Sequence, residues 1–256
     1  MVAIFLRSLV FNLLFYPVFL FWAVIALPTL MMPRAALMRV AAWWARSNIV
    51  LMRAICNIKV EFRGVEKIPK GPLIVAAKHQ SMWETISLLR FFDAPFFVLK
   101  RELTWIPLFG LFVIKANMIA IDRGAGARAL RAIMRRAEEE VQHGRQFLIF
   151  PEGTRRPVGA PPHYKSGVSM IYADCGVPCL PVALNSGLFW PRRTFLRYPG
   201  TLVVEFLDPL PPGLPRHEFM TRIESLIEEA SNRLIAAGQA EQAELFARTP
   251  AAAAKA

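Results

Sequence analysis

The residues best suited to chemistry are a histidine and a glutamate five positions apart. His79 follows the apolar run PLIVAAK, and Glu84 directly precedes the helical run TISLLRFF. A histidine that leaves the carboxyl end of a strand lies where α/β sheets place their sites. If the turn is tight, Glu84 can fix the imidazole tautomer while His79 acts as a general base. The alternative is structural, because Ser81 and Glu84 also have the spacing of a helix capping box.

A second polar stretch, Pro151-Glu-Gly-Thr-Arg155, follows the apolar run Gln146–Phe150. Its glycine lets the backbone approach a ligand closely, and its arginine offers a planar fork suited to phosphate. Taken alone, the stretch is equally a polar turn with a surface arginine. No nucleophilic serine or cysteine motif and no His-Glu-x-x-His accompanies either stretch. A base that acts on a substrate hydroxyl is therefore the chemistry favoured.

Together these motifs resemble the glycerolipid acyltransferase family, specifically the bacterial 1-acylglycerol-3-phosphate acyltransferases. That family has four ordered blocks: His-x4-Asp, Ile-x-Arg, Pro-Glu-Gly-Thr-Arg and Val-Pro-x-x-Pro-Val. They are matched here by residues 79–84, 121–123, 151–155 and 177–182, with Glu84 at the place of the family's usual aspartate. A Lys-x-Glu-Leu stretch at residues 100–103 and a Lys-x-Gly at 165–167 also fit. The resemblance covers roughly residues 60–210.

The resemblance implies direct transfer of an acyl group from a thioester to the hydroxyl of a lysophosphatidate, which gives phosphatidate without an acyl-enzyme. His79 would deprotonate the hydroxyl and Glu84 would orient His79. The acceptor phosphate would be bound by Arg155, Lys100 and Arg123, beside a substrate-site loop of Glu152, Gly153 and Thr154. The cosubstrate would be an acyl-carrier protein or coenzyme A thioester. No cofactor and no metal are expected.

Two alternatives remain open from the sequence. Another lysolipid, such as a lyso-ornithine lipid or a lysophospholipid, would require only a different head-group site. The chain could instead be a non-catalytic membrane or nucleic-acid binding protein, since its net charge is +12 and a basic balance points to anionic partners. No nucleic-acid motif is recognisable, so we expect membrane lipids as partners and no nucleic acid.

The apolar stretch LTWIPLFGLFVI at residues 103–114 is a candidate acyl-chain pocket, and an ordinary buried core segment is the alternative. The pocket candidates are Trp105, Phe109, Gly110 and Phe112. A small residue among bulky ones could set the depth of such a pocket.

The rest of the chain predicts an α/β domain with a mixed sheet flanked by helices, as in the glycerolipid acyltransferase fold, preceded by N-terminal membrane-associated helices. Helical periodicity covers residues 125–143 and 216–237. We expect anchoring helices over 1–57, the acyltransferase domain over 58–237 and a flexible tail over 238–256. The strand-like runs are 60–62, 73–77, 96–99, 118–121, 146–150, 179–183 and 202–206.

The N-terminal 60 residues contain no Asp or Glu, and residues 8–33 carry no charge. As a helix, those 26 residues would extend about 39 Å, against a bilayer core of about 30 Å. The next segment repeats an arginine every seven residues (Arg39, Arg46, Arg53), as in an interfacial helix. One span with an interfacial helix, a hairpin in one leaflet, and a helix packed on the domain all fit. The resemblance implies a bacterial inner membrane location, and the arginines predict that the catalytic domain faces the cytoplasm.

Overall fold

Seven strands form one sheet in the order β1-β7-β6-β2-β5-β3-β4. All neighbouring strands are parallel except β6 and β7, which are antiparallel. The computed structural model describes residues 1–122, 124 and 126–253. Each predicted strand-like run becomes a strand, which confirms the mixed sheet. The strands are β1 (Ile58–Arg63), β2 (Leu73–Ala77), β3 (Pro95–Lys100), β4 (Ile119–Ile121), β5 (Gln146–Ile149), β6 (Cys179–Leu184) and β7 (Gly200–Phe206).

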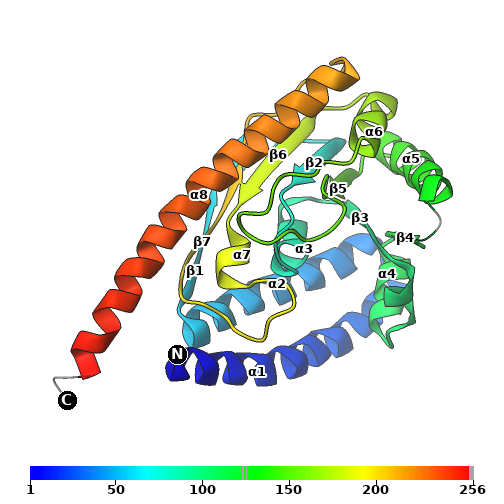
Figure 1. Cartoon of the computed structure of the whole chain (residues 1–256). Helices are drawn as coiled ribbons and strands as arrows, with labels where there is room; N and C mark the ends of the chain where they lie inside the picture. The colour runs from blue at the N-terminus through cyan, green and yellow to red at the C-terminus, as the bar shows by residue number, and fades with distance from the viewer. Residues whose placement is uncertain (123, 125, 254–256) are drawn as a thin grey trace.

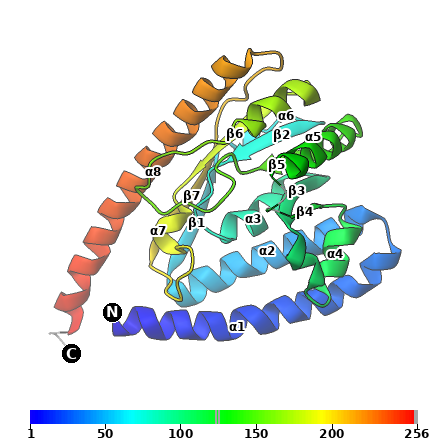
Figure 2. The same ribbon diagram turned by 45° about the vertical axis from the view of Figure 1, so that its right-hand side comes forward.

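Helices cover both faces of the sheet (Figure 1). The α1–α2 hairpin lies along one side of the molecule, and α5, α6 and α8 lie on the other; the turned view in Figure 2 agrees. The helices are α1 (Val2–Ala26), α2 (Arg34–Cys56), α3 (Trp83–Ser87), α4 (Phe109–Lys115), α5 (Gly126–Gln142), α6 (Gly167–Cys175), α7 (Ser186–Phe189) and α8 (Arg216–Ala253). Short 3-10 turns are η1 (Leu27–Met31), η2 (Val65–Lys67), η3 (Leu88–Phe91) and η4 (Arg101–Trp105).

The central strand β2 shows why the sheet needs both helical layers. All five of its residues are buried, and successive side chains of a strand point to opposite faces. Leu73, Val75 and Ala77 belong to the core cluster that contains residues of α1 and α2. Ile74 and Ala76 belong to the cluster formed with α5, α6 and α8. A continuous apolar run is typical of such a doubly covered parallel strand.

The C-terminal boundary predicted from the sequence is wrong. Instead of ending near residue 237, α8 continues to Ala253. The segment is rich in Ala, Glu and Gln, which have high helix propensity. It is also tied to the sheet, because Glu241 accepts hydrogen bonds from the Thr201 backbone N–H (2.7 Å) and hydroxyl (2.8 Å). The apolar periodicity of the sequence stops near residue 237 because the helix leaves the hydrophobic core there. It does not stop because the helix ends.

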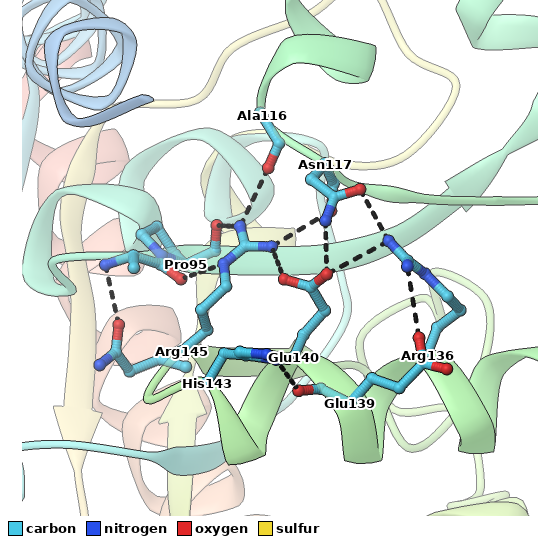
Figure 3. Close-up of polar contacts among 10 residues, drawn as sticks. Pro95, Ala116, Asn117, Arg136, Glu139, Glu140, His143 and Arg145 are labelled. Atoms are coloured by element: carbon cyan, nitrogen blue, oxygen red, sulfur yellow. Dashed lines mark hydrogen bonds and ion pairs between the residues drawn. The ribbon is translucent and has the colours of Figure 1, made fainter. Parts of the chain in front are cut away.

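A buried ion pair joins β3, α4, α5 and β5 (Figure 3). The Arg145 guanidinium lies 2.6 Å from the Glu140 carboxylate and also donates to backbone carbonyls, including those of Ala116 (2.9 Å) and Pro95 (3.2 Å). Glu140 in turn accepts from Arg136 (3.3 Å) and Asn117. The cluster therefore holds the C-terminal end of α4 against the sheet.

The N-terminal hairpin is apolar and only partly covered. The segment from Val2 to Met31 is long and apolar enough to cross a membrane, and 22% of its most apolar window is buried in the protein. Its buried positions, which include Ile4, Phe11 and Phe15, lie on one face of α1, and the remaining surface exposes large apolar side chains. Pro17 lies inside α1 without ending it.

Candidate active site

The candidate residues gather because five strands share one direction. Strands β2 to β6 are mutually parallel through the pairs β2–β5, β2–β6, β3–β5 and β3–β4, so their carboxyl ends lie at one edge. His79 comes two residues after β2, and the Pro-Glu-Gly-Thr-Arg loop comes directly after β5. This edge is where open α/β sheets bind ligands.

His79 and Glu84 form the pair that their spacing predicts. The His79 Nδ1 lies 3.0 Å from the Glu84 Oε1. The Glu84 side chain is fully buried, and that of His79 is 12% exposed. A carboxylate at Nδ1 favours the tautomer with a proton on that nitrogen. The other nitrogen, Nε2, makes no hydrogen bond to any residue that the structure describes, so it can accept a proton from a bound hydroxyl.

Glu84 serves the backbone as well as the histidine. Its Oε1 also accepts the backbone N–H groups of Gln80 (2.8 Å) and Ser81 (2.6 Å), and its Oε2 accepts the Ser186 hydroxyl at 2.9 Å. The contact with Ser81 is the carboxylate half of a capping box. Helix α3 begins only at Trp83, whose N–H donates to the Ser81 hydroxyl at 3.2 Å. The capping and dyad contacts therefore coexist in one carboxylate.

The loop after β5 holds His79 from the other side. Phe150 stacks on the imidazole, with ring centroids 3.9 Å apart. Glu152 faces inward instead of toward a substrate, because its oxygens contact the Lys78 ammonium and the His79 backbone N–H, each at 3.0 Å. Gly153 has φ +66°, which favours glycine at this turn, and Thr154 is exposed beside it.

The three predicted phosphate ligands differ in how near they lie to His79. Arg155 follows β5, the direct neighbour of β2, and its guanidinium has no hydrogen bond or ion pair with any described residue. Lys100 ends β3, two strands from β2 or about 10 Å at ordinary strand spacing. It pairs with Glu102 at 2.7 Å, and its hydrogen bond lowers the Glu102 pKa. Arg123 lies outside the described residues. Of the two predicted ligands that the structure describes, Arg155 therefore follows the strand nearer to β2.

An apolar cavity lies between α1, α2, α4 and β3, with about 640 Å³ of space that is partly open to the surroundings. Phe109 and Phe112 line it, together with Phe19 and Trp22 of α1. Trp105 is 68% exposed and is not a lining residue. Gly110 does not line the cavity either.

The structure gives Gly110 a packing role instead of the depth-setting role expected from the sequence. A Cβ at this position would lie 1.9 Å from the Thr104 carbonyl oxygen. Glycine is therefore needed for α4 to pack on η4.

Several neighbours of the dyad had no signal in the sequence. Ser186, which donates to Glu84, is 102 residues away along the chain. Lys78, directly before His79, is only 4% exposed although lysine is rarely buried without a partner. Its second partner, Glu228, lies 150 residues away on α8. The polar end of the run VAAK was the one available hint, because it places a lysine directly after a buried strand.

Comparisons with known proteins agree with the site and the fold. The family model "Acyltransferase" matches residues 59–185, which include all four motifs. A 1-acyl-sn-glycerol-3-phosphate acyltransferase of Pseudomonas aeruginosa is 42% identical over 161 residues, 63% of this chain and 63% of that protein. The match therefore spans less than two thirds of that relative's length. A lyso-ornithine lipid O-acyltransferase of the same organism is 28% identical over 210 residues, 75% of this chain and 78% of that one.

The solved structure of the 1-acyl-sn-glycerophosphate acyltransferase PlsC from Thermotoga maritima superposes with a TM-score of 0.74 at 26% identity. The match covers 90% of this chain and 97% of that one. The likeness thus extends well beyond the residues that the family model matches. With its motifs in order at one edge of this sheet, the chain belongs to the acyltransferase family.

Proposed function

We propose that this protein transfers an acyl group from an acyl thioester to the sn-2 hydroxyl of 1-acylglycerol 3-phosphate. The product is phosphatidate, for phospholipid biosynthesis. His79 accepts the hydroxyl proton at Nε2 as the oxygen attacks the thioester carbonyl. The C–S bond then breaks, and the thiolate of the donor leaves as a thiol after it takes this proton from the imidazolium. Glu84 stabilises the imidazolium that forms, as a carboxylate does in a base–orienter pair.

The observation that carries this proposal is the His79–Glu84 pair with an unbonded Nε2 at the ligand-binding edge of the sheet. Direct transfer is favoured because, among the residues that the structure describes, no side chain beside His79 is poised as a nucleophile. The Ser186 hydroxyl donates a hydrogen bond to the Glu84 carboxylate. All three cysteines are buried, and burial raises the Cys175 pKa to about 12. These thiols therefore stay protonated at neutral pH.

The acceptor is proposed from the cation beside the base. Arg155 presents an unpaired, half-buried guanidinium next to the strand that bears His79, and a guanidinium fork matches phosphate oxygens in two hydrogen bonds. The likeness to the lyso-ornithine lipid O-acyltransferase supports a second candidate, transfer to a lysolipid without a glycerol phosphate. The donor, an acyl-carrier protein or a coenzyme A thioester, stays a proposal in either case.

The apolar cavity supports a substrate with a long hydrocarbon chain. All of its lining residues are apolar, as contact with a hydrocarbon chain requires. It is walled by the N-terminal hairpin, the part of the chain with the most exposed apolar surface. An acyl chain could therefore pass from a membrane into the protein without crossing water. We propose that Phe109 and Phe112 contact that chain.

We further propose that α1 and α2 lie in one leaflet of a membrane instead of spanning it. The buried face of α1 packs on the catalytic domain from Ile4 to Ala26, so a helix across the bilayer would carry the domain into it. The exposed positions of α1, such as Phe5, Leu13 and Phe21, suit the acyl boundary. The arginines of α2 favour anionic headgroups, in keeping with the cytoplasmic face of a bacterial inner membrane.

The test is acyl transfer by the purified protein in detergent, with a panel of acceptors and both donor types. The acceptors are 1-acylglycerol 3-phosphate, a lysophospholipid with a substituted phosphate, and a lyso-ornithine lipid. The proposal expects the first acceptor to give the highest kcat/KM. A preference for lyso-ornithine lipid would replace it with the second candidate. Absence of transfer to every acceptor from either donor would refute acyl transfer to these lysolipids.

A further inference from the structure

A buried polar cluster lies directly behind His79 and joins it to α8. The Lys78 ammonium lies 3.0 Å from the Glu152 Oε1 and 2.5 Å from the Glu228 Oε1. The Tyr164 hydroxyl donates to the same Glu228 oxygen at 2.9 Å. These residues come from the end of β2, the loop after β5, the segment before α6 and the middle of α8. Lys78 adjoins His79 in the chain, and hydrogen bonds connect the other three residues to Lys78. The whole cluster therefore lies close to the catalytic edge.

Burial of these charged groups costs desolvation free energy, which argues that the cluster has a function. It holds one ammonium and two carboxylates, so one negative charge is in excess when all three are ionised. The Lys78 and Glu152 side chains are 5% and 0% exposed. Burial raises the Glu152 pKa, against the opposing effect of Lys78. Burial and the nearby Glu228 raise the Tyr164 pKa, so this hydroxyl keeps its proton and remains a donor. An apolar core would avoid such desolvation.

The cluster reaches the base through hydrogen bonds to the backbone. The Glu152 Oε2 accepts the His79 N–H at 3.0 Å, and the His79 carbonyl accepts the Arg156 N–H at 2.8 Å. Both partners belong to the loop that carries Arg155. The position of the imidazole relative to the proposed phosphate ligand is therefore set by how Glu152 is held. Glu152 is held by Lys78, and Lys78 is held by Glu228.

We propose that Glu228 is a positioning residue for acyl transfer: through Lys78 and Glu152 it fixes the His79 backbone against the loop that bears Arg155. Glu228 touches no substrate in this scheme. It orients the ammonium between the two carboxylates, and Tyr164 fixes the carboxylate of Glu228 in turn. The inference rests on the proposed function, because it concerns the geometry of that same reaction.

The test compares Glu228→Gln with Glu229→Gln. The variant Glu228→Gln keeps an oxygen acceptor for Lys78 and Tyr164 but removes the charge. Glu229 is the matched control, because it lies on the same helix, is exposed and is hydrogen-bonded to Ser225 only among the described contacts. The measurements are the melting temperature in detergent, and kcat and the acceptor KM well below that temperature. Tyr164→Phe is the milder second variant, used if Glu228→Gln does not fold.

Displacement of a catalytic group by about 1 Å can lower the reaction rate about 10²-fold. Glu228 acts on His79 only through Lys78 and Glu152, so we expect Glu228→Gln to lower kcat by less, about tenfold. The acceptor KM should stay within about twofold, and Glu229→Gln should match the wild type. A merely structural role would leave the kcat of the folded enzyme unchanged, and that result would overturn the inference. A change in KM alone would also overturn it, because it would assign Glu228 to acceptor binding.

The two proposals fail in different ways. If the wild-type enzyme transfers acyl groups and Glu228→Gln keeps its kcat, only the positioning role is lost. If the wild type prefers another lysolipid, the same comparison is made with that acceptor, since His79 serves as base in either case. If the wild type transfers nothing, the proposed function fails and the positioning role falls with it.

Discussion

At the scale of single residues, Glu84 makes both sets of contacts that the sequence presents as alternatives. Three N–H groups converge on its Oε1, two from the backbone and one from His79. The backbone contacts hold the oxygen in place whether or not the imidazole is charged. The dyad is therefore preorganised by the same hydrogen bonds that start helix α3. A glutamate, one methylene longer than aspartate, fits here because its carboxylate reaches His79, Gln80, Ser81 and Ser186 at once.

We predict that Glu84→Gln lowers kcat by about 10²-fold, at the lower end of general-base contributions. The amide oxygen can still accept from Gln80, Ser81 and His79, and its NH₂ can donate to the Ser186 hydroxyl. The fold and tautomer should therefore survive, and only the charge that stabilises the imidazolium is lost. The measurements are kcat and melting temperature. Glu84→Asp, which keeps the charge, should retain more activity than Glu84→Gln. Near wild-type turnover by folded Glu84→Gln would leave Glu84 as a capping residue only.

We predict that Arg155→Lys raises the acceptor KM more than the donor KM. Lysine keeps the charge but loses the planar fork that binds two phosphate oxygens. Initial rates at varied acceptor and donor concentrations give both constants. Arg193→Lys is the control, because Arg193 is an exposed arginine of the loop before β7. Equal changes in both constants, or a change in the donor KM alone, would assign Arg155 to another task.

The sequence pointed to His79, Glu84 and Arg155 because they lie within short motifs that stand in order along the chain. It did not indicate the side chains that hold this region in place. Ser186 is 102 residues from its partner Glu84, and Glu228 is 150 residues from its partner Lys78. Such contacts depend on strand order, and one sequence does not fix that order. The inward direction of Glu152 was likewise hidden, because its loop reads as polar and exposed.

At the scale of elements, the predicted strands were confirmed because their apolar runs are buried on both faces. The helix boundaries were harder, as α8 shows. Beyond residue 237 the apolar periodicity fades, but polar contacts such as that of Glu241 with Thr201 replace it. The candidate site depends on the arrangement of strands, since the carboxyl ends of β2, β3 and β5 lie at one edge of the sheet. Only Arg123, after β4, falls outside the described residues.

We predict that Glu140→Gln destabilises the protein at pH 7 by about 3 kcal/mol, because it leaves the buried Arg145 without its counter-charge. Burial alone would raise the Glu140 pKa, but the Arg145 hydrogen bond and the charges of Arg145, Arg136 and Arg34 together lower it below 4.5. A lowered folded-state pKa gives stability that is present above pH 4.5 and is lost as the pH falls through the folded-state pKa.

The check is the difference in melting temperature between wild type and Glu140→Gln as a function of pH. The difference should be largest near pH 7 and should shrink below pH 4.5. Glu139→Gln is the control, since Glu139 is 47% exposed and pairs with Arg136 at 3.3 Å. It should change the melting temperature little at any pH. A difference independent of pH would show that the charge of Glu140 does not stabilise the fold.

At the scale of the whole molecule, the apolar cavity lies between the N-terminal hairpin and β3, one of the strands whose ends form the catalytic edge. The hairpin supplies exposed apolar surface, and residues of the hairpin, of α4 and of β3 line the cavity. Figure 2 shows α4 beside the hairpin. A lipid acceptor held in a membrane would present its headgroup to the protein while its chains stay in an apolar medium. The sequence predicted the apolar and basic character of this region, but the packing of α1 along the domain required the structure.

We predict that the protein stays with the membrane fraction after a wash in 1 M salt. Attraction between arginines and lipid headgroups is screened within about 3 Å at that ionic strength, whereas burial of apolar surface is not. The measurement is the distribution of the protein between membrane pellet and supernatant. Release by salt would show that the basic residues alone hold it, against insertion of α1. Detergent should release it in either case.

The most direct test of the account is the rate of phosphatidate formation by wild-type protein and by His79→Gln. Both are purified in the same detergent and given 1-acylglycerol 3-phosphate with an acyl thioester. Glutamine keeps a planar polar group against Phe150 but is not a base. The account predicts transfer by the wild type and a loss of at least about 10²-fold in His79→Gln, at an unchanged melting temperature. Wild-type turnover by folded His79→Gln would contradict His79 as the base.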